Sequence, residues 1–430
     1  MDRRNSPWIY LNLKVWGLGQ SATLAINERS RELAAQGRQI YRLGLGQSPF
    51  PVPESVAQAL RDHAHQKDYL AVKGLPALRQ AIVDFFRRTE DLEYDADSVL
   101  VGPGTKELMF ILQLTYYGDL VIPTPSWVSY APQAQILGRP LQWLPTAPET
   151  GLGVTPEALD ALCRIEPERP RLLILNSPGN PTGTVYSRDR LEAIAEVARR
   201  YRVLLLSDEI YSGTQFDGDH VSIARYYPEG TIISNGLSKW CGAGGWRLGA
   251  FVFPAGLNKL LRGMAAVASE TFTSTSAPIQ YAAVRGFQGG PDIDVYLDRS
   301  RRLLQALAEF AHARLVETGA EVSCPAGGFY IFPNFESHRE RLLQRGIHDN
   351  ASMCERLLEE TGVACLPGSV FGRPPTEFST RLAYVDFDGG PALEALAELP
   401  AGELPDAHFL RTWCPRTVAG FEHLADWIAS

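Results

Sequence analysis

The chain has 430 residues, of which 45% are hydrophobic and 21% are charged, a composition typical of globular proteins. Its formal net charge is −8 and it has no long run of Lys or Arg, so we expect no nucleic-acid partner. No apolar run reaches membrane-spanning length, and Met1 to Asn12 lack the pattern of a signal peptide. We therefore expect a cytoplasmic protein with no membrane partner.

The residue types that commonly bind metals form no recognisable pattern. The six cysteines are far apart and include no CxxC pair, and no Asp, Glu or Cys completes a site around His63 and His65. The sequence therefore predicts reduced thiols and no metal centre.

Apolar residues at helical spacing predict a first helix from Ser21 to Gly37, and the next segment, GLGQSPFPVP, predicts a loop. Between Ser98 and Pro254, short apolar runs alternate with helical stretches. The runs lie at 98–102, 120–123, 172–175, 203–206, 231–234 and 249–253. Such runs between helices predict an α/β domain with a mostly parallel sheet, whose ligands bind beyond the carboxyl ends of the strands.

A long charged helical pattern from Pro291 to Leu315 predicts a helix that leads into a second domain. Strand-like runs follow it, VSCPAGGFYIF and RLAYVDF, which indicate a smaller α+β domain that also takes in the N-terminal segment. The expected division is 1–50 for the N-terminal arm and part of the small domain, 51–300 for the large domain, and 301–430 for the rest of the small domain.

Polar loops follow three of the predicted strands: NSPGNPTG, DEIY and SKWCGAGGWRLG. Lys239 follows TIISNGL, where a strand would bring its amine to the sheet edge as a plausible nucleophile; a surface lysine is the alternative. Asp208 ends a run too apolar to finish in a carboxylate without a partner. A protonated ring nitrogen is one such partner, and the cap of the next turn is the other interpretation.

The segment from Gly102 to Lys106 lies between a predicted strand and a predicted helix, whose free amides can hold a phosphate. It matches neither GxxxxGK[ST] nor GxGxxG, which argues against nucleoside triphosphates and dinucleotides. Arg247 could supply a second contact as a planar fork. A small phosphorylated cofactor fits these features.

Together these motifs resemble the class I and II aminotransferases, the fold-type-I pyridoxal-phosphate family, from about Ser21 to Tyr384. The matching motifs are SATLAINERSRELAAQG, KDYLAVKGLPALRQAI, PTPSWVSY, NSPGNPTG, SDEIY, SK followed by GGWRLG, GGFYIF, VACLPGSVFG and RLAY. The resemblance implies a large domain with a mostly parallel seven-stranded sheet and a smaller α+β domain. It also implies pyridoxal 5'-phosphate as cofactor and ping-pong transfer of an amino group between an L-amino acid and a 2-oxo acid.

The resemblance implies a role for each matching residue. Lys239 would hold the cofactor as a Schiff base and then move the α-proton of the substrate. Asp208 would pair with the pyridine nitrogen, and Trp127 would stack on the ring. Asn180 and Tyr211 would bind the phenolic oxygen of the cofactor.

The same resemblance places the cofactor phosphate at Gly104, Thr105, Lys106 and Arg247. Tyr69 matches a tyrosine that reaches the phosphate of the neighbouring subunit, which implies a homodimer with shared active sites. Arg381 matches the arginine that receives the substrate α-carboxylate, assisted by the backbone of Gly46 and the side chain of Asn180.

The chain also departs from the family pattern. Gly236 stands where many relatives have a phosphate-binding serine, and Ser234 or Ser238 are the candidates to replace it. The segment 271–276 has no arginine of the kind that some dicarboxylate-specific relatives place there, so strict specificity for aspartate or glutamate is not predicted. The native donor and acceptor stay open, and the segment 400–416 receives no function.

Two other functions remain. The same fold and lysine also support lyase, cyclase or oxidase chemistry on an amino acid. Aminotransferase-like domains also serve as ligand sensors fused to DNA-binding modules, but no basic helix-turn-helix segment precedes the resemblance here.

Overall fold

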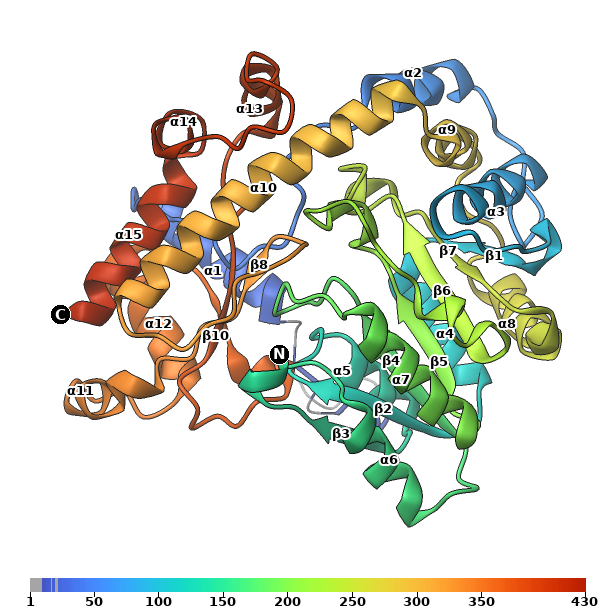
Figure 1. Ribbon diagram of the computed structural model, residues 1–430, viewed down its shortest axis with the longest axis horizontal. Helices are drawn as coiled ribbons and strands as arrows, with labels where there is room; N and C mark the ends of the chain where they lie inside the picture. Colours follow the sequence, from blue (N-terminus) through green and yellow to red (C-terminus); the bar gives the residue numbers. More distant parts are fainter. Residues whose placement is uncertain (1–9, 17, 20–21) are drawn as a thin grey trace, which may run out of the picture.

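Two sheets organise the chain in the computed structural model, which describes residues 10–16, 18–19 and 22–430. A seven-stranded sheet lies in one half of the molecule and a three-stranded sheet in the other (Figure 1). The long helix α10 (Pro291–Glu317) runs from one half to the other.

The larger sheet has the order β1-β7-β6-β5-β4-β2-β3. Its strands are β1 (Val99–Gly102), β2 (Asp119–Thr124), β3 (Leu141–Pro145), β4 (Arg171–Asn176), β5 (Leu204–Asp208), β6 (Thr231–Gly236) and β7 (Gly249–Val252). Only β7 runs antiparallel to its neighbours. In the parallel part, Asn176 pairs with Asp208 and Asp208 with Ser234, so the carboxyl ends of β4, β5 and β6 share one edge.

Helices cover both faces of this sheet because both faces are apolar. Leu204 and Leu206 of β5 pack on the side of α4 (Thr105–Thr115) and α8 (Asn258–Thr271), whereas Leu205 packs on the side of α6 (Pro156–Ile165) and α7 (Arg188–Arg200). The helices of this half are α2 (Glu54–His63), α3 (Pro76–Glu90), α4 (Thr105–Thr115), α5 (Tyr130–Leu137), α6 (Pro156–Ile165), α7 (Arg188–Arg200), α8 (Asn258–Thr271) and α9 (Ala277–Gln288).

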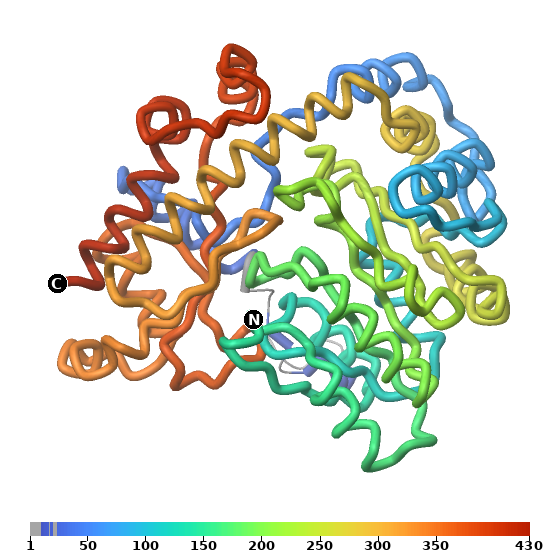
Figure 2. The backbone as a smooth tube through the Cα atoms, in the orientation of Figure 1, coloured from blue at the N-terminus to red at the C-terminus, as the bar shows by residue number. Residues whose placement is uncertain are grey.

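The smaller sheet has the order β8-β10-β9 and lies among the remaining helices. Its strands are β8 (Tyr330–Ile331), β9 (Leu366–Pro367) and β10 (Thr380–Ala383). The helices are α1 (Ala22–Ala35), α11 (Arg339–Gln344), α12 (Asn350–Thr361), α13 (Gly389–Leu396), α14 (Ala407–Trp413) and α15 (Pro415–Ala429). Tyr41 forms a bridge with Val363, so an early segment joins this C-terminal half, as the backbone trace also shows (Figure 2).

The predicted fold class is confirmed: a mostly parallel seven-stranded sheet with a smaller α+β part. All six predicted apolar runs contain strands, and the predicted helix from Pro291 continues to Glu317. The edge strand β3 was not predicted because its residues are mostly half-exposed and form no continuous apolar run. The first predicted helix is present as α1, and Ser21 lies outside the described residues.

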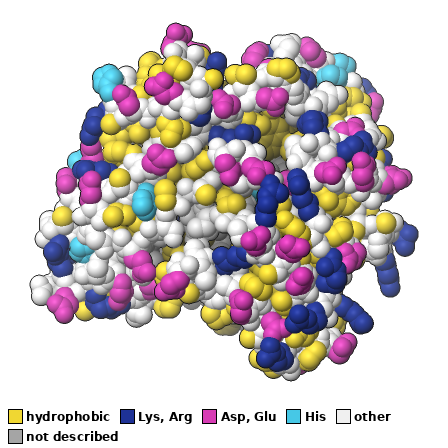
Figure 3. Space-filling model, viewed as in Figure 1, with side chains coloured by type: hydrophobic (Ala, Val, Ile, Leu, Met, Phe, Trp, Pro, Cys, Tyr) yellow, Lys and Arg dark blue, Asp and Glu magenta, His cyan; other side chains and the backbone are white. Residues whose placement is uncertain are grey.

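Acidic and basic side chains are interspersed on the face seen in Figure 3. In the part of the chain that the structure describes, no helix combines the length and the apolar character needed to cross a bilayer. The same residues contain no group of three or more His, Cys, Asp or Glu arranged to hold a metal ion.

Candidate active site

A cavity of about 620 Å³ lies at the carboxyl edge of β4, β5 and β6. It collects most of the predicted site residues, although they come from distant parts of the chain. Those that line it are Gly46, Thr105, Lys106, Trp127, Asn180, Asp208, Tyr211, Lys239 and Arg247. The position agrees with the general rule that ligands of parallel sheets bind beyond the strand carboxyl ends.

Lys239 lies three residues beyond the end of β6, and its side chain extends into the cavity. Its Nζ donates a hydrogen bond to the carbonyl oxygen of Gly46 at 2.7 Å. The amine also lies 5.4 Å from the ring centres of Tyr211 and Phe329. The lysine thus presents a nitrogen inside a partly apolar pocket without a carboxylate partner among the described residues.

Asp208 is the last residue of β5 and is only 3% exposed. The hydroxyl of Tyr130 donates to its Oδ2 at 2.6 Å, and the Ser234 hydroxyl lies 3.4 Å from its Oδ1. Burial raises the pKa of Asp208 to about 6, against the lowering effect of these hydrogen bonds. A cationic partner inside the cavity would offset that cost of burial.

Arg381 lies on β10 of the smaller sheet and is fully buried. Its Nη1 donates to Oδ1 of Asn180 at 3.2 Å, and its Nη2 donates to the carbonyl of Gly44 at 2.7 Å. The guanidinium also stacks on Tyr330, 4.4 Å from the ring centre, and on Phe371 at 5.1 Å. No carboxylate of the described residues lies within ion-pair distance of it. A buried cation is costly without a negatively charged partner, so this position favours the binding of an anion.

The start of α4 and the loop before β7 form another side of the cavity. Gly104 precedes α4 with a φ of 90°, and a Cβ there would lie 2.3 Å from Nη2 of Arg247. Glycine therefore lets the guanidinium approach the free amides at the start of the helix. Lys106 also faces this end, and burial, together with the charges of Arg247 and Lys239, lowers its pKa.

Tyr130 and Tyr330 contact predicted site residues but were not themselves predicted from the sequence. Tyr130 belongs to the quoted motif PTPSWVSY, and Tyr330 belongs to GGFYIF, but neither spacing indicates a contact with Asp208 or Tyr211. The hydroxyl of Tyr330 lies 2.9 Å from that of Tyr211 and also donates to the carbonyl of Gly46 at 3.4 Å. A Cβ on Gly46 would lie 1.8 Å from the Tyr330 hydroxyl oxygen, so only glycine fits there.

Other predicted residues lie outside the cavity lining. Tyr69 is 90% exposed and is not part of the cavity wall of its own chain. Of the two candidates to replace the serine at Gly236, Ser238 lines the cavity whereas Ser234 is buried against Asp208. A side chain at Gly236 itself would lie 2.7 Å from the carbonyl oxygen of Leu248.

The donors and charges of the cavity fit pyridoxal 5'-phosphate. An amine is present for the aldehyde, a buried carboxylate with a raised pKa for the ring nitrogen, and helix amides with Arg247 for the phosphate. This fold and this set of groups define a class of protein, the fold-type-I pyridoxal-phosphate enzymes.

The comparisons with known proteins narrow this class. The family model for aminotransferase class I and II matches residues 38–387. An aspartate aminotransferase of Geobacillus stearothermophilus is 35% identical over 382 residues, which cover 86% of this chain and 93% of that protein. An asparagine–oxo-acid transaminase of Streptococcus mutans is 32% identical over 386 residues, covering 87% and 94%.

The solved structure of aspartate aminotransferase from Thermus thermophilus with maleate superposes with a TM-score of 0.82 at 29% identity, covering 97% of this chain and 100% of that one. The chain belongs to the class I and II aminotransferase family. It is a pyridoxal-phosphate-dependent transferase that moves an amino group between an L-amino acid and a 2-oxo acid.

Proposed function

We propose that Lys239 is the lysine that holds pyridoxal phosphate as a Schiff base, with Asp208 against the ring nitrogen. Trp127 lies over the ring face, and Asn180 and Tyr211 bind the phenolic oxygen. The phosphate is held by Gly104, Thr105, Lys106, Arg247 and, in place of the missing serine at 236, by Ser238. The support is that an amine and a buried carboxylate line one cavity from neighbouring strands.

Arg381 is the proposed receptor of the substrate α-carboxylate, together with Asn180 and the backbone of Gly46. The observation that carries this proposal is the buried guanidinium without a carboxylate partner among the described residues. Two of its nitrogens already donate to Asn180 and Gly44, which fixes the plane of the group. A guanidinium fixed in this way can donate two parallel hydrogen bonds to a carboxylate.

The chain's own residues prepare the reaction by orientation and proton transfer. Bound pyridoxal phosphate acts as an electron sink for the substrate α-carbon. Arg381 fixes one end of the substrate, so that the α-carbon lies within reach of the Lys239 amine, which takes up the α-proton and later returns it. The buried rings of Tyr211 and Phe329 keep water away from that amine.

We propose an acidic L-amino acid, aspartate first, as the amino donor. The printed names of several relatives support this choice, since they describe aspartate aminotransferases and aspartate/prephenate aminotransferases.

We further propose a cytoplasmic homodimer with shared active sites. The support is Tyr69, which is 90% exposed in the single chain and fits the role of reaching the phosphate in the partner's cavity. The proposed domains remain 51–300 for the larger one and 1–50 with 301–430 for the smaller one. Helix α10 runs without a break through positions 300 and 301.

The test is single-turnover absorbance of the cofactor-loaded protein against a panel of amino acids, with Lys239→Ala as control. We expect aspartate to convert the cofactor band to that of its amine form and oxaloacetate to restore it. Conversion by another amino acid instead would replace the proposed donor. Consumption of the amino acid without any lasting change of the band would point to lyase, cyclase or oxidase chemistry and contradict the proposed sequence of steps.

A further inference from the structure

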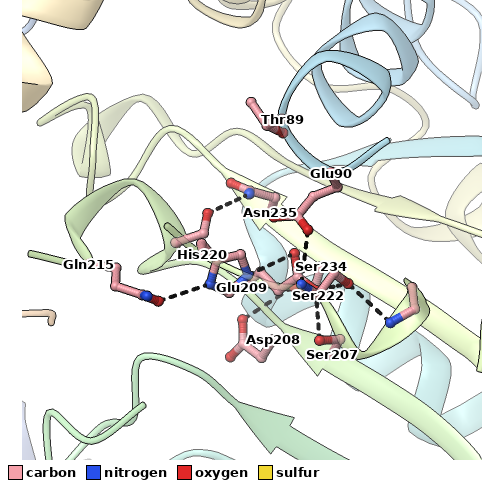
Figure 4. Close-up of polar contacts among 12 residues, drawn as sticks. Thr89, Glu90, Ser207, Asp208, Glu209, Gln215, His220, Ser222, Ser234 and Asn235 are labelled. Carbon is pink, nitrogen blue, oxygen red and sulfur yellow. Dashed lines mark hydrogen bonds and ion pairs between the residues drawn. The ribbon is translucent and has the colours of Figure 1, made fainter. Parts of the chain in front are cut away.

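Glu209, the residue after Asp208, belongs to a second buried polar cluster (Figure 4). Asp208 lines the cavity of about 620 Å³, whereas Glu209 lines a separate cavity of about 160 Å³ together with Glu90 and His220. Successive side chains at the end of a strand point to opposite faces. The two neighbouring carboxylates therefore lie on opposite sides of the end of β5.

Both oxygens of Glu209 are held. Its Oε1 accepts hydrogen bonds from the hydroxyls of Ser207, at 2.7 Å, and Ser222. Its Oε2 lies 3.3 Å from Nε2 of His220. Neither of these last two atoms has a hydrogen-bond partner elsewhere in the described part of the chain, and both side chains are buried. Among the described residues, Oε2 of Glu209 and Nε2 of His220 therefore have only each other as a polar neighbour.

The charges of the cluster balance when His220 is protonated. Glu90, at the end of α3, accepts hydrogen bonds from the backbone N–H of Ser222 at 2.9 Å and from Nε of Arg225 at 3.0 Å. Two carboxylates then face two cations. Burial lowers the pKa of His220, but the hydrogen bond and charge of Glu209 and the charge of Glu90 outweigh it and raise this pKa overall.

Other titratable groups surround the cluster. The pKa of Tyr94 is raised by burial and by the charge of Glu209, which keeps its hydroxyl neutral. The remaining charged groups that line the smaller cavity are Arg88, Asp294 and Arg301. Among the charged contacts of this cluster, the Glu209–His220 pair is the one that contains the residue directly after Asp208.

The cluster is connected to Asp208 through the backbone of β5 and β6. The N–H of Glu209 donates to the carbonyl of Ser234 at 2.9 Å, and the Ser234 hydroxyl lies 3.4 Å from Oδ1 of Asp208. The charge of Glu209 also raises the pKa of Asp208, as the last of several causes after burial. Both the position and the charge of Glu209 therefore act on its neighbour.

We propose that Glu209 and His220 are a positioning pair for Asp208: the pair fixes the end of β5, and protonated His220 cancels the negative charge of Glu209 behind the carboxylate that faces the cofactor ring. This inference rests on the proposed function, in which Asp208 pairs with the ring nitrogen. Neither residue lines the larger cavity, so both act through Asp208.

The pair makes a prediction about sign that a purely structural role does not. Without Glu209 the surroundings of the ring become more positive and a bound proton leaves more easily, whereas without the charge of His220 they become more negative. An unmatched charge roughly 10 Å away, at an effective dielectric constant of about 20 to 40, shifts a pKa by about 0.5 to 1 unit.

The experiment is a pH titration of the cofactor absorbance of the holoenzyme. We expect Glu209→Gln to lower the pKa of the absorbance change by about 0.5 to 1 unit and His220→Gln to raise it by a similar amount. The double variant should return close to the native value. Shifts of both single variants in the same direction, or no shift in either, would overturn the proposal.

Each single substitution leaves a buried group without its partner, so one of them could fail to fold. Glu90→Gln then carries the test, because it removes a charge from the same cluster but leaves the Glu209–His220 contact in place. We expect it to lower the pKa of the absorbance change by less than Glu209→Gln does, and a rise or no change would count against the proposal.

Asp208→Asn in the same titration distinguishes a failure of the positioning role from a failure of the proposed contact between Asp208 and the ring. If Asp208→Asn alters the absorbance titration and the pair variants do not, the positioning role is wrong and the proposed site stands. If Asp208→Asn leaves the titration unaltered, the proposed pairing of Asp208 with the ring is itself wrong.

Discussion

Tyr211 and Tyr330 meet hydroxyl to hydroxyl at 2.9 Å, one from the loop after β5 and the other from β8 of the smaller sheet. Their rings are nearly perpendicular, with centres 5.7 Å apart. Tyr330 also carries the guanidinium of Arg381 on its face. This one tyrosine therefore connects the proposed cofactor contact at Tyr211 with the proposed substrate contact at Arg381.

Tyr330→Phe tests that connection. The substitution removes a neutral hydrogen bond, worth about 0.5 to 1.5 kcal/mol, and keeps the aromatic face under Arg381. We expect a roughly two- to tenfold fall in kcat/KM, measured with the preferred amino acid. Tyr330→Leu removes the face as well and should cost more. Equal losses in the two variants would show that the aromatic face under Arg381 contributes nothing, and no loss in Tyr330→Phe would show that the hydroxyl contributes nothing.

Arg381→Lys tests the carboxylate receptor. The variant keeps one positive charge but loses the fork that donates to Asn180 and Gly44. Disrupting a buried, hydrogen-bonded charge pair costs about 2 to 5 kcal/mol, so kcat/KM should fall roughly 30-fold or more. The protein should still bind the cofactor, because the hydrogen bonds of Arg381 go to Asn180 and Gly44 and to none of the proposed phosphate-binding residues. Near-native kcat/KM would exclude Arg381 as the receptor.

Cofactor binding by the cofactor-free protein should depend on pH near the pKa of Asp208, which burial raises to about 6. Below that pH the carboxyl is protonated and cannot pair with a cationic ring nitrogen, so affinity should fall as pH decreases through 6. Equilibrium binding between pH 5 and 8 measures this. Asp208→Asn, which cannot titrate, should flatten the profile; a profile of unchanged shape in that variant assigns the transition to another group.

The carboxyl of Asp208 also makes the stability of the cofactor-free fold depend on pH, in the direction opposite to that expected for cofactor binding. Its folded-state pKa of about 6 exceeds the ordinary value of 3.8, so the folded chain retains a proton that the unfolded chain releases. The stability contributed by this group is complete below 3.8 and is lost as pH rises through 6. Thermal melting of cofactor-free native protein and Asp208→Asn over this range should show the difference.

Tyr130→Phe should weaken cofactor binding most at low pH. The Tyr130 hydroxyl lowers the pKa of Asp208 by its hydrogen bond, so removing it raises that pKa further. The loss of cofactor affinity should then begin at a higher pH than in the native protein. Tyr116→Phe is a matched control, since its hydroxyl donates to the backbone of Arg171, outside the cavity lining. An identical pH profile in the two variants would speak against a role for Tyr130.

Mixing two inactive variants tests the shared site. A chain with Tyr69→Ala and a chain with Lys239→Ala form a hybrid dimer in which one site has both native residues, provided that Tyr69 reaches into the partner's cavity. After subunit exchange of equal amounts, about half of the dimers are hybrids, so roughly a quarter of native activity should return. Exchange without recovery would place Tyr69 outside the neighbouring site.

The local pattern of the sequence was sufficient for the large sheet because its strands are buried on both faces. Runs such as 172–175 and 203–206 are apolar at every position, as expected of strands that are buried on both faces. The edge strand β3 was not predicted from the sequence, because most of its residues are half-exposed or exposed. The grouping of the polar loops after β4, β5 and β6 could also be predicted, since parallel strands bring their carboxyl ends to one edge of the sheet.

The sequence alone predicted the main groups of the proposed site, each from its motif: an amine at Lys239, a carboxylate at Asp208 and an arginine at 381. Only the tertiary structure decided which groups complete it. Tyr130 meets Asp208, Tyr330 meets Tyr211, and His220 faces Glu209 behind them. These contacts depend on how α5, β8 and the loop at 220 pack around β5, and side-chain contacts between distant segments leave no periodic signal in a single sequence.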